Sequence, residues 1–160
     1  MTLLEKVDVM DKWEKLGFLI GSWDSPMSGE PGRAVAGSST FSYLLDRNIL
    51  IRNSRAEFAA EPGASKGLVH DDLLIIYQPP GGSDLQAIYF DNEGHVINYS
   101  VSFLENMSGV IFDSPATTFS PRARLVYTTT SEGTLEVEFF VAFSGDDLKS
   151  HVKGILLKKK

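Results

Sequence analysis

Residues 95–103 read HVINYSVSF, a stretch in which apolar and polar side chains alternate. Ile97, Tyr99, Val101 and Phe103 share one face, and the polar residues between them share the other. Residues 135–143 (LEVEFFVAF) repeat the pattern, with Glu136 and Glu138 opposite an apolar face. A period of two indicates a β-strand with one face on the core and one in water. Strands of this kind predict an antiparallel sheet that buries one side.

Turn signals recur about every 8–12 residues along the chain and divide it into about ten such strands. We expect strands near residues 18–23, 38–45, 48–59, 68–77, 85–90, 95–103, 110–112, 123–130, 134–144 and 150–158. One helix is predicted before them, at about residues 3–16, with a capping box at residues 2–5 and Gly17 as its stop. No shift in composition marks a boundary, so residues 1–160 are expected to form one domain.

A single sheet with one apolar face can bury that face by curling into a barrel. We therefore predict a mainly β fold: an antiparallel up-and-down β-barrel of about ten strands, spanning about residues 18–158, with a short N-terminal helix. Eight strands already enclose enough space for side chains or one small ligand, and the diameter grows with strand number. Ten strands are therefore expected to leave a cavity.

The composition argues against several kinds of partner. The chain has 160 residues, no cysteine, and 15 basic against 21 acidic residues, for a net charge of −6. This acidic balance disfavours nucleic acid and anionic membrane surfaces. No apolar run approaches the roughly 18 residues of a spanning helix, and the N-terminus lacks the pattern of a secretory signal. We expect a cytoplasmic protein that does not insert into membranes.

A family resemblance rests on residues 18–23 (FLIGSW), which follow the predicted helix. Gly21-Ser22-Trp23 resembles the Gly-x-Trp signature of the calycin superfamily, which includes lipocalins, fatty-acid-binding proteins and nitrobindins. With residues 75–77 and 88–95, this segment also resembles uncharacterised bacterial lipocalin-like proteins. The resemblance implies a lipocalin-like barrel in which Trp23 closes one end against a basic side chain of the last strand, Lys153 or Lys158. The alternative is that Trp23 is simply a core aromatic.

The chain also departs from two members of that superfamily. Nitrobindins carry a Gly-rich run after the Trp and a haem-ligating His, whereas residues 24–27 here read DSPM and His151 is expected on the outside. Fatty-acid-binding proteins hold a carboxylate with an Arg-x-Tyr pair. Here Arg124 and Tyr127 are three residues apart, which places them on opposite strand faces. We expect no haem, no other cofactor and no carboxylate clamp of this kind.

The candidate ligand-binding residues are those expected to point into the barrel. They are Asn53, Arg55, Tyr99, Phe103, Thr128 and Phe139. Arg55 is the candidate cation because it shares a strand face with Ile49 and Ile51, and its alternative role is a surface salt bridge. The three histidines lack the spacing of metal ligands, so no metal site is expected.

Three functions remain open at this point. The first is a protein that holds a small apolar or amphipathic molecule inside the barrel, which is the usual use of a wide barrel with an apolar interior. The second is an enzyme, an isomerase or hydrolase, in the same cavity, although no nucleophile and base are apparent and no catalytic residue is assigned. The third is a filled barrel that acts through a surface contact, with a homodimer as one form of it.

Overall fold

The computed structural model, which describes residues 11–26, 34–106 and 108–160, is a closed antiparallel barrel of ten strands. Each strand pairs with the next one along the chain, and β10 returns to β1. The strands are β1 (Gly21–Ser25), β2 (Ala34–Leu44), β3 (Ile49–Phe58), β4 (Val69–Tyr77), β5 (Gln86–Asp91), β6 (Val96–Phe103), β7 (Gly109–Ser114), β8 (Arg122–Thr129), β9 (Leu135–Ala142) and β10 (Lys149–Lys158). The predicted mainly β, up-and-down barrel is confirmed.

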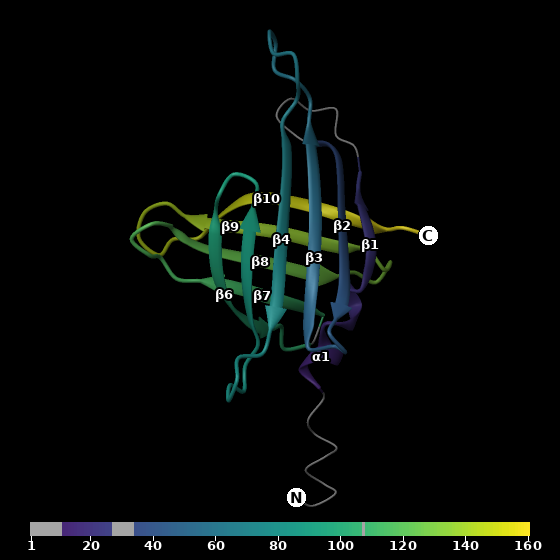
Figure 1. Ribbon diagram of the computed structural model, residues 1–160, viewed down its shortest axis with the longest axis vertical. Coiled ribbons are helices and arrows are strands. Elements are labelled where there is room, and N and C mark those ends of the chain that lie inside the picture. The colour runs from purple at the N-terminus through teal and green to yellow at the C-terminus, as the bar shows by residue number, and fades with distance from the viewer. Residues whose placement is uncertain (1–10, 27–33, 107) are drawn as a thin grey trace, which may run out of the picture.

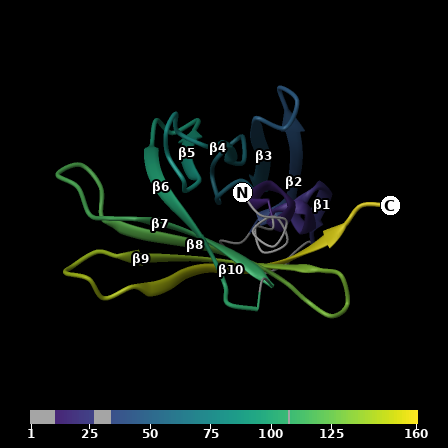
Figure 2. The same ribbon diagram turned by 90° about the horizontal axis from the view of Figure 1, so that it is seen from below.

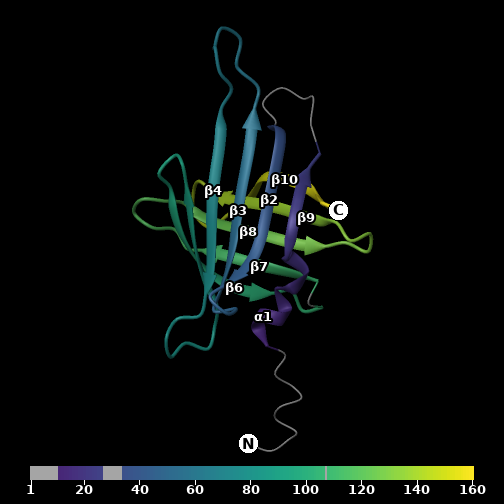
Figure 3. The ribbon, with the colours of Figure 1, turned by 45° about the vertical axis from the view of Figure 1, so that its right-hand side comes forward.

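The barrel is flattened into two layers whose strands cross. In Figure 1, β2, β3 and β4 run vertically in front, and β8, β9 and β10 run across them behind. Figure 2, viewed from below, shows β7–β10 as one layer and β2–β5 on the other side of the interior, and the turned view in Figure 3 shows the same crossing. Side chains from the two layers therefore meet along the middle of the molecule.

One end of the barrel is capped by two short helices, α1 (Lys12–Lys15) and the 3₁₀ turn η1 (Gly17–Leu19). Asp11 caps α1 by accepting a hydrogen bond from the backbone N–H of Trp13 at 3.1 Å. Most of the helix predicted over residues 3–16, including its capping box, lies outside the described residues. The prediction that a strand starts at residue 18 is wrong, because Leu19 is fully buried in η1 and the strand begins at Gly21.

Trp23 lies beside this cap and is 2% exposed, as predicted. Its indole N–H donates to the carbonyl of Leu19 at 2.8 Å, which ties β1 to η1. Lys158 of the last strand places its ammonium 5.4 Å from the Trp23 ring centroid, within the range of a cation–π contact. Gly21 has φ +129°, and a Cβ there would lie 3.1 Å from Lys158 Cε, so the first residue of the motif needs to be glycine.

The interior has two halves with different linings. The closed half, next to α1 and η1, is lined by side chains that are all fully buried: Leu16, Leu19, Leu50, Ile76 and Leu135. The open half, toward the other strand ends, is lined by side chains that are only half-buried: His70, Tyr89, Ile97 and Phe139. The inward-facing side chains of this half are therefore partly in contact with solvent.

Candidate functional site

Arg52 is a charged side chain in the middle of the barrel interior. It lies on β3, where Leu50, Arg52 and Ser54 face inward, and only 5% of its side chain is exposed. Its neighbours in the sheet are Phe41 on β2 and Leu74 on β4, both of which are buried core residues. A buried cation among apolar side chains is costly unless it is paired and hydrogen-bonded.

Two partners hold the guanidinium, one from the neighbouring strand β4 and one from the opposite layer. Nη1 donates to the hydroxyl of Tyr127 on β8 at 2.7 Å, and Nη2 donates to Oδ1 of Asp72 on β4. The guanidinium carbon also lies 5.9 Å from the ring centroid of Tyr89 and 6.0 Å from that of Tyr127. Arg52 thus joins the two layers of the barrel across its interior.

One donor of Arg52 is left without a partner. Its Nε is buried and makes no hydrogen bond with any described residue. A buried N–H that lacks an acceptor costs about 1–3 kcal/mol, so such groups are rare unless a water or ligand supplies the acceptor. Among the described residues, Nε of Arg52 is therefore a buried donor whose hydrogen bond is not satisfied.

A polar network leads from Arg52 to the open end of the barrel. The Tyr89 hydroxyl donates to Oδ2 of Asp91 at 3.1 Å and lies 3.1 Å from Nε2 of His70. His70 Nδ1 is 3.0 Å from Oε1 of Glu93. Side-chain exposure rises along this path, from 12% at Asp72 to 26% at His70 and 46% at Glu93. The network connects the buried cation with the solvent at the rim.

Burial and charge set the protonation of the inner groups. Burial disfavours the charged form of Arg52, but Tyr127 and Asp72 outweigh it and raise its pKa above the usual value. Burial also raises the pKa of Tyr127 and of Tyr89, although the nearby Arg52 cation opposes it in both cases. Arg52 therefore stays charged, and the phenols around it stay neutral and able to donate.

The carboxylate of Asp91 accepts hydrogen bonds from several donors. Burial by itself would raise its pKa, but the backbone N–H and side chain of His95, the backbone N–H of Glu93 and the Tyr89 hydroxyl lower it below the usual value. The backbone N–H groups of His95 and Glu93 donate to Oδ1 at 2.9 and 3.0 Å. Asp91 thus fixes both the turn after β5 and the position of Tyr89.

The charges of this site favour a neutral ligand over an anion. Arg52, the one cation that is buried among the described residues, is paired with Asp72, and the network beyond it adds the carboxylates of Asp91 and Glu93. An anionic head group beside Arg52 would therefore meet the repulsion of nearby carboxylates. A hydroxyl, carbonyl or amide oxygen can accept from Nε without that repulsion.

Three of the six predicted ligand-binding residues face the interior as expected. Tyr99 is 3% exposed and packs edge-on against Phe112, with ring centroids 6.0 Å apart. Phe103 packs against the core near the helices, with the Lys15 ammonium 5.3 Å from its ring. Phe139 lies in the open half, 6.4 Å from the ring of His151. The structure thus confirms their orientation.

The predicted inward orientation of Asn53, Arg55 and Thr128 is wrong. Arg55 is exposed and donates to Glu57 at 3.1 Å and to Asp71 at 3.2 Å, which makes it the surface ion pair given as its alternative role. Asn53 is exposed on the same outer face, and Thr128 follows the inward-facing Tyr127 and so points outward. On β3 the run Ile49-Leu50-Ile51 is apolar on both faces, so alternation alone did not identify the inner one.

The sequence interpretation missed Arg52, Asp72, Tyr89, Asp91 and Tyr127. One signal was present on β4, where Asp72 shares a face with Leu74 and Ile76. A carboxylate on the apolar face of a strand requires a partner, and Arg52 is the basic residue of the inner face of β3, the strand beside it. The inference that Arg124 and Tyr127 point to opposite faces is confirmed, because Arg124 pairs with Asp113 outside the barrel.

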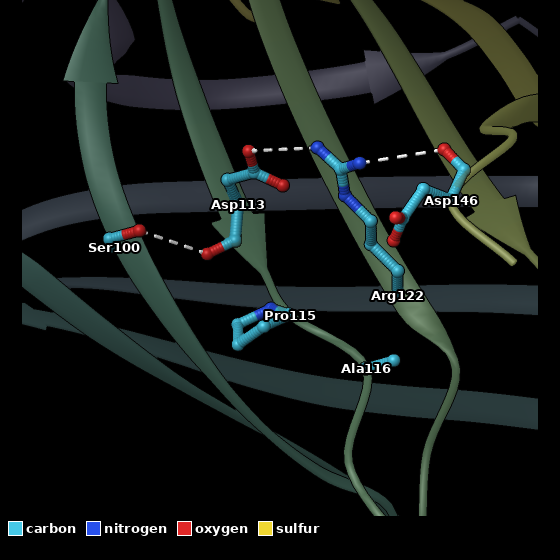
Figure 4. A pocket seen from close by; sticks show the side chains of 6 residues that line it. All are labelled: Ser100, Asp113, Pro115, Ala116, Arg122 and Asp146. Atoms are coloured by element: carbon cyan, nitrogen blue, oxygen red, sulfur yellow. Dashed lines mark hydrogen bonds and ion pairs between the residues drawn. The ribbon is translucent and has the colours of Figure 1, made fainter.

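Two surface hollows lie away from this network. The first, of about 340 Å³, is on the outer face around Ser100, Asp113, Arg122 and Asp146. Figure 4 shows Arg122 between Asp113 and Asp146, whose backbone oxygen accepts from Arg122 Nη1 at 3.4 Å. The second, of about 460 Å³, lies between the β7–β8 and β9–β10 loops beside Phe119 and Phe143. Neither hollow opens onto Arg52.

His151 is exposed, as predicted, but the prediction that it lies on the outer face with Lys153 is wrong. A β-bulge between Ser150 and Val152 interrupts the alternation of β10. The ring of His151 therefore lies against Phe139 and Phe143, at centroid distances of 6.4 and 6.0 Å. In the described ranges, no three His, Asp or Glu side chains converge as a metal site would require.

Comparison with known proteins leaves the family open. No protein-family model matches this chain. No curated protein matches its sequence either. Within the described part of the chain, no helix is both long and apolar enough to cross a bilayer. The interpretation of the site therefore rests on its own geometry.

Proposed function

We propose that this protein binds a neutral amphipathic small molecule in the open half of its barrel. The observation that carries the proposal is the buried Nε of Arg52, a fixed donor that no described residue satisfies. The ligand's hydroxyl, carbonyl or amide oxygen accepts from this N–H. Its apolar part lies along Ile97 and Phe139, which face the interior and remain half-buried.

The residues around Arg52 support a preference for ligands with a neutral polar head group. Tyr127 and Asp72 fix the guanidinium, so its orientation does not have to be established when the ligand binds. Asp72 and Asp91 disfavour a carboxylate head group for the reason given above. We therefore expect fatty alcohols, esters or amides to bind better than fatty acids of the same length.

As part of this proposal, we assign the barrel to the calycin type. Its support is the contact between Trp23 and Lys158, the glycine at residue 21 and the helical cap beside them. In this arrangement one end is closed and apolar, and the ligand enters from the other. A barrel of this type holds its ligand inside, which agrees with the proposed position of the ligand's oxygen beside Arg52.

The experiment measures binding of the neutral dye Nile red and its displacement by dodecan-1-ol, dodecane and dodecanoate. For the unmodified protein we expect saturable dye binding and displacement by the alcohol at least as well as by the acid. Arg52→Lys keeps the charge but removes the Nε donor. It should weaken the alcohol at least tenfold, a loss of about 1.4 kcal/mol, while the affinity for dodecane changes little.

Arg55→Lys is the matched control, because Arg55 lies on the same strand but on the outer face. It should leave all three affinities unchanged. Equal weakening of the alcohol and dodecane in Arg52→Lys would contradict a hydrogen bond to the ligand. An absence of saturable binding by any probe to the folded protein would contradict the function itself.

A further inference from the structure

At the seam between β1 and β10, most of one edge of β10 has no strand partner in the described ranges. β10 pairs with β9 from Lys149 to Leu156, but it pairs with β1 only at Leu157 and Lys158. Figure 1 shows why: β10 runs across the back of the barrel and meets β1 only near its C-terminal end. Among the described residues, no strand therefore pairs with the other edge of β10 from Lys149 to Ile155.

The direction of the backbone groups on this edge follows from one hydrogen bond. The N–H of Lys159 donates to the carbonyl of Ser22 at 2.8 Å, so it points toward β1. Backbone groups of a strand point to alternate edges, so the N–H and C=O of Ile155 and Lys153 also point to the β1 side. No described residue forms a backbone hydrogen bond with these groups from the β1 side, so they can pair with a further strand.

Proline explains why β1 does not provide that strand. The register that pairs Trp23 with Lys158 and Asp24 with Leu157 would bring Pro26 opposite Ile155. Proline has no N–H, so it cannot complete the next hydrogen-bonded pair. β1 accordingly ends at Ser25, and within the described part of the chain no other strand pairs with the edge beyond it.

The side chains of β10 indicate the charge and polarity of a strand that would pair with this edge. Besides Lys158, which lies over Trp23 at the closed end, β10 contains two lysines, one histidine and no acidic residue, in a protein with a net charge of −6. Lys149 is 3.9 Å from Asp147, whereas the ion pairs of the described residues include none for Lys153, although Glu138 lies opposite it on β9. Ile155, two residues on and 48% exposed, adds an apolar position on the same face.

We infer that the free edge of β10 binds an extended acidic peptide segment of a partner protein as an eleventh strand. Main-chain hydrogen bonds to Lys153 and Ile155 supply the pairing, as in other cases of strand addition. An acidic side chain lies beside Lys153, and an apolar one lies beside Ile155. Lysines on an edge oppose pairing with a second copy of the same strand, which is one way that proteins avoid aggregation through open edges.

Amide hydrogen exchange followed by NMR tests the free edge directly. In the free protein, the amides of Lys153 and Ile155 should exchange fast, while that of Gly154, which points toward β9, is protected. A saturating seven-residue peptide with glutamate and valine at alternate same-face positions should slow the two edge amides at least tenfold. Protection of Lys153 and Ile155 without peptide would overturn the inference, because the edge would already be covered by this chain or by a second copy.

Fluorescence anisotropy with the same peptide, labelled with fluorescein, tests the charge preference. A matched peptide with lysine in place of glutamate should bind at least tenfold more weakly. Lys153→Glu should weaken the acidic peptide at least tenfold, whereas Lys66→Glu, the same change on an exposed loop, should leave it unaltered. Equal binding of both peptides, or no effect of Lys153→Glu, would overturn the proposed partner while leaving the ligand site inside the barrel untouched.

Discussion

The closed and open halves of the barrel interior are built on the same strands but in different ways. In the closed half, β3 and β4 contribute Leu50 and Ile76, which are fully buried. Further along the same two strands, the inward positions are Arg52 and Asp72. The inner face of each strand therefore changes from apolar to charged within two to four residues.

This change separates the part of the interior that stabilises the fold from the part where we propose that a ligand binds. The closed half gains free energy from apolar burial, at about 25 cal/mol for each Å² removed from water. The open half contains a buried ion pair, which contributes little or nothing to stability compared with apolar side chains of similar volume. Mutations in the two halves should therefore affect the stability of the fold differently.

The first prediction concerns the closed half. Trp23→Ala should lower the free energy of unfolding by about 3–5 kcal/mol, because it leaves a large cavity and breaks the hydrogen bond to Leu19. Urea unfolding followed by far-UV circular dichroism measures the change. Phe119→Ala is the control at the other end, and since Phe119 is 95% exposed it should change stability by less than about 0.5 kcal/mol. An unchanged midpoint for Trp23→Ala would contradict the role of Trp23 in the cap.

The second prediction concerns Arg52. Arg52→Met should destabilise the fold by about 3–5 kcal/mol, because Asp72 is left as an uncompensated buried charge. Replacing both partners in Arg52→Met/Asp72→Leu should recover most of that loss, whereas Arg55→Met on the outer face should change stability by less than about 1 kcal/mol. Chemical denaturation of the three variants measures these differences. If the double variant is no more stable than Arg52→Met alone, the unpaired charge of Asp72 does not cause the loss, and the pair stabilises the fold in some other way.

Alternation predicted the fold because it is a local property of each strand. Residues 95–103 and 135–143 show which side chains face the core, and the orientations of Tyr99, Phe103 and Phe139 follow from it. The orientation of β3 could not be obtained in this way. Because residues 49–51 are all apolar, either face of β3 could be the inner one by alternation. Which face points inward depends on the pairing with Phe41 and Leu74 on the neighbouring strands.

The polar site depends on contacts that are still more distant in the sequence. Arg52 and Tyr127 are 75 residues apart and meet only because the flattened barrel brings its two layers together. No spacing rule in one sequence encodes such a pair. The charged residues on apolar strand faces, Arg52 and Asp72, were the available signal, and it identifies the members of the cluster but not their mutual geometry.

The third prediction separates the two partners of Arg52. Tyr127→Phe should destabilise the protein by about 1–3 kcal/mol, because Nη1 of Arg52 loses its acceptor while the ring packing is kept. Thermal unfolding by calorimetry measures the loss. Tyr77→Phe is the control, because its hydroxyl lies in an exposed hydrogen bond with Gln86, and it should have a smaller effect. Equal effects of the two changes would indicate that the buried hydrogen bond contributes no more than a surface one.

The fourth and smallest effect concerns acid stability at the rim of the open half. The pKa of Asp91 is lower in the folded protein than its unfolded value of about 3.9, so its ionised form stabilises the fold above that value. This stabilisation is lost as the pH falls from the unfolded pKa through the folded one. Asp91→Asn should therefore be less stable than the unmodified protein at pH 7, and the difference should shrink below about pH 4.

Calorimetric midpoints at pH 7, 4 and 3 measure this difference in stability, with Asp84→Asn as the control because the side chain of Asp84 is 86% exposed. A difference that stayed constant down to pH 3 would mean that Asp91 acts through packing and turn geometry, and its charge would then not be part of what disfavours anions beside Arg52.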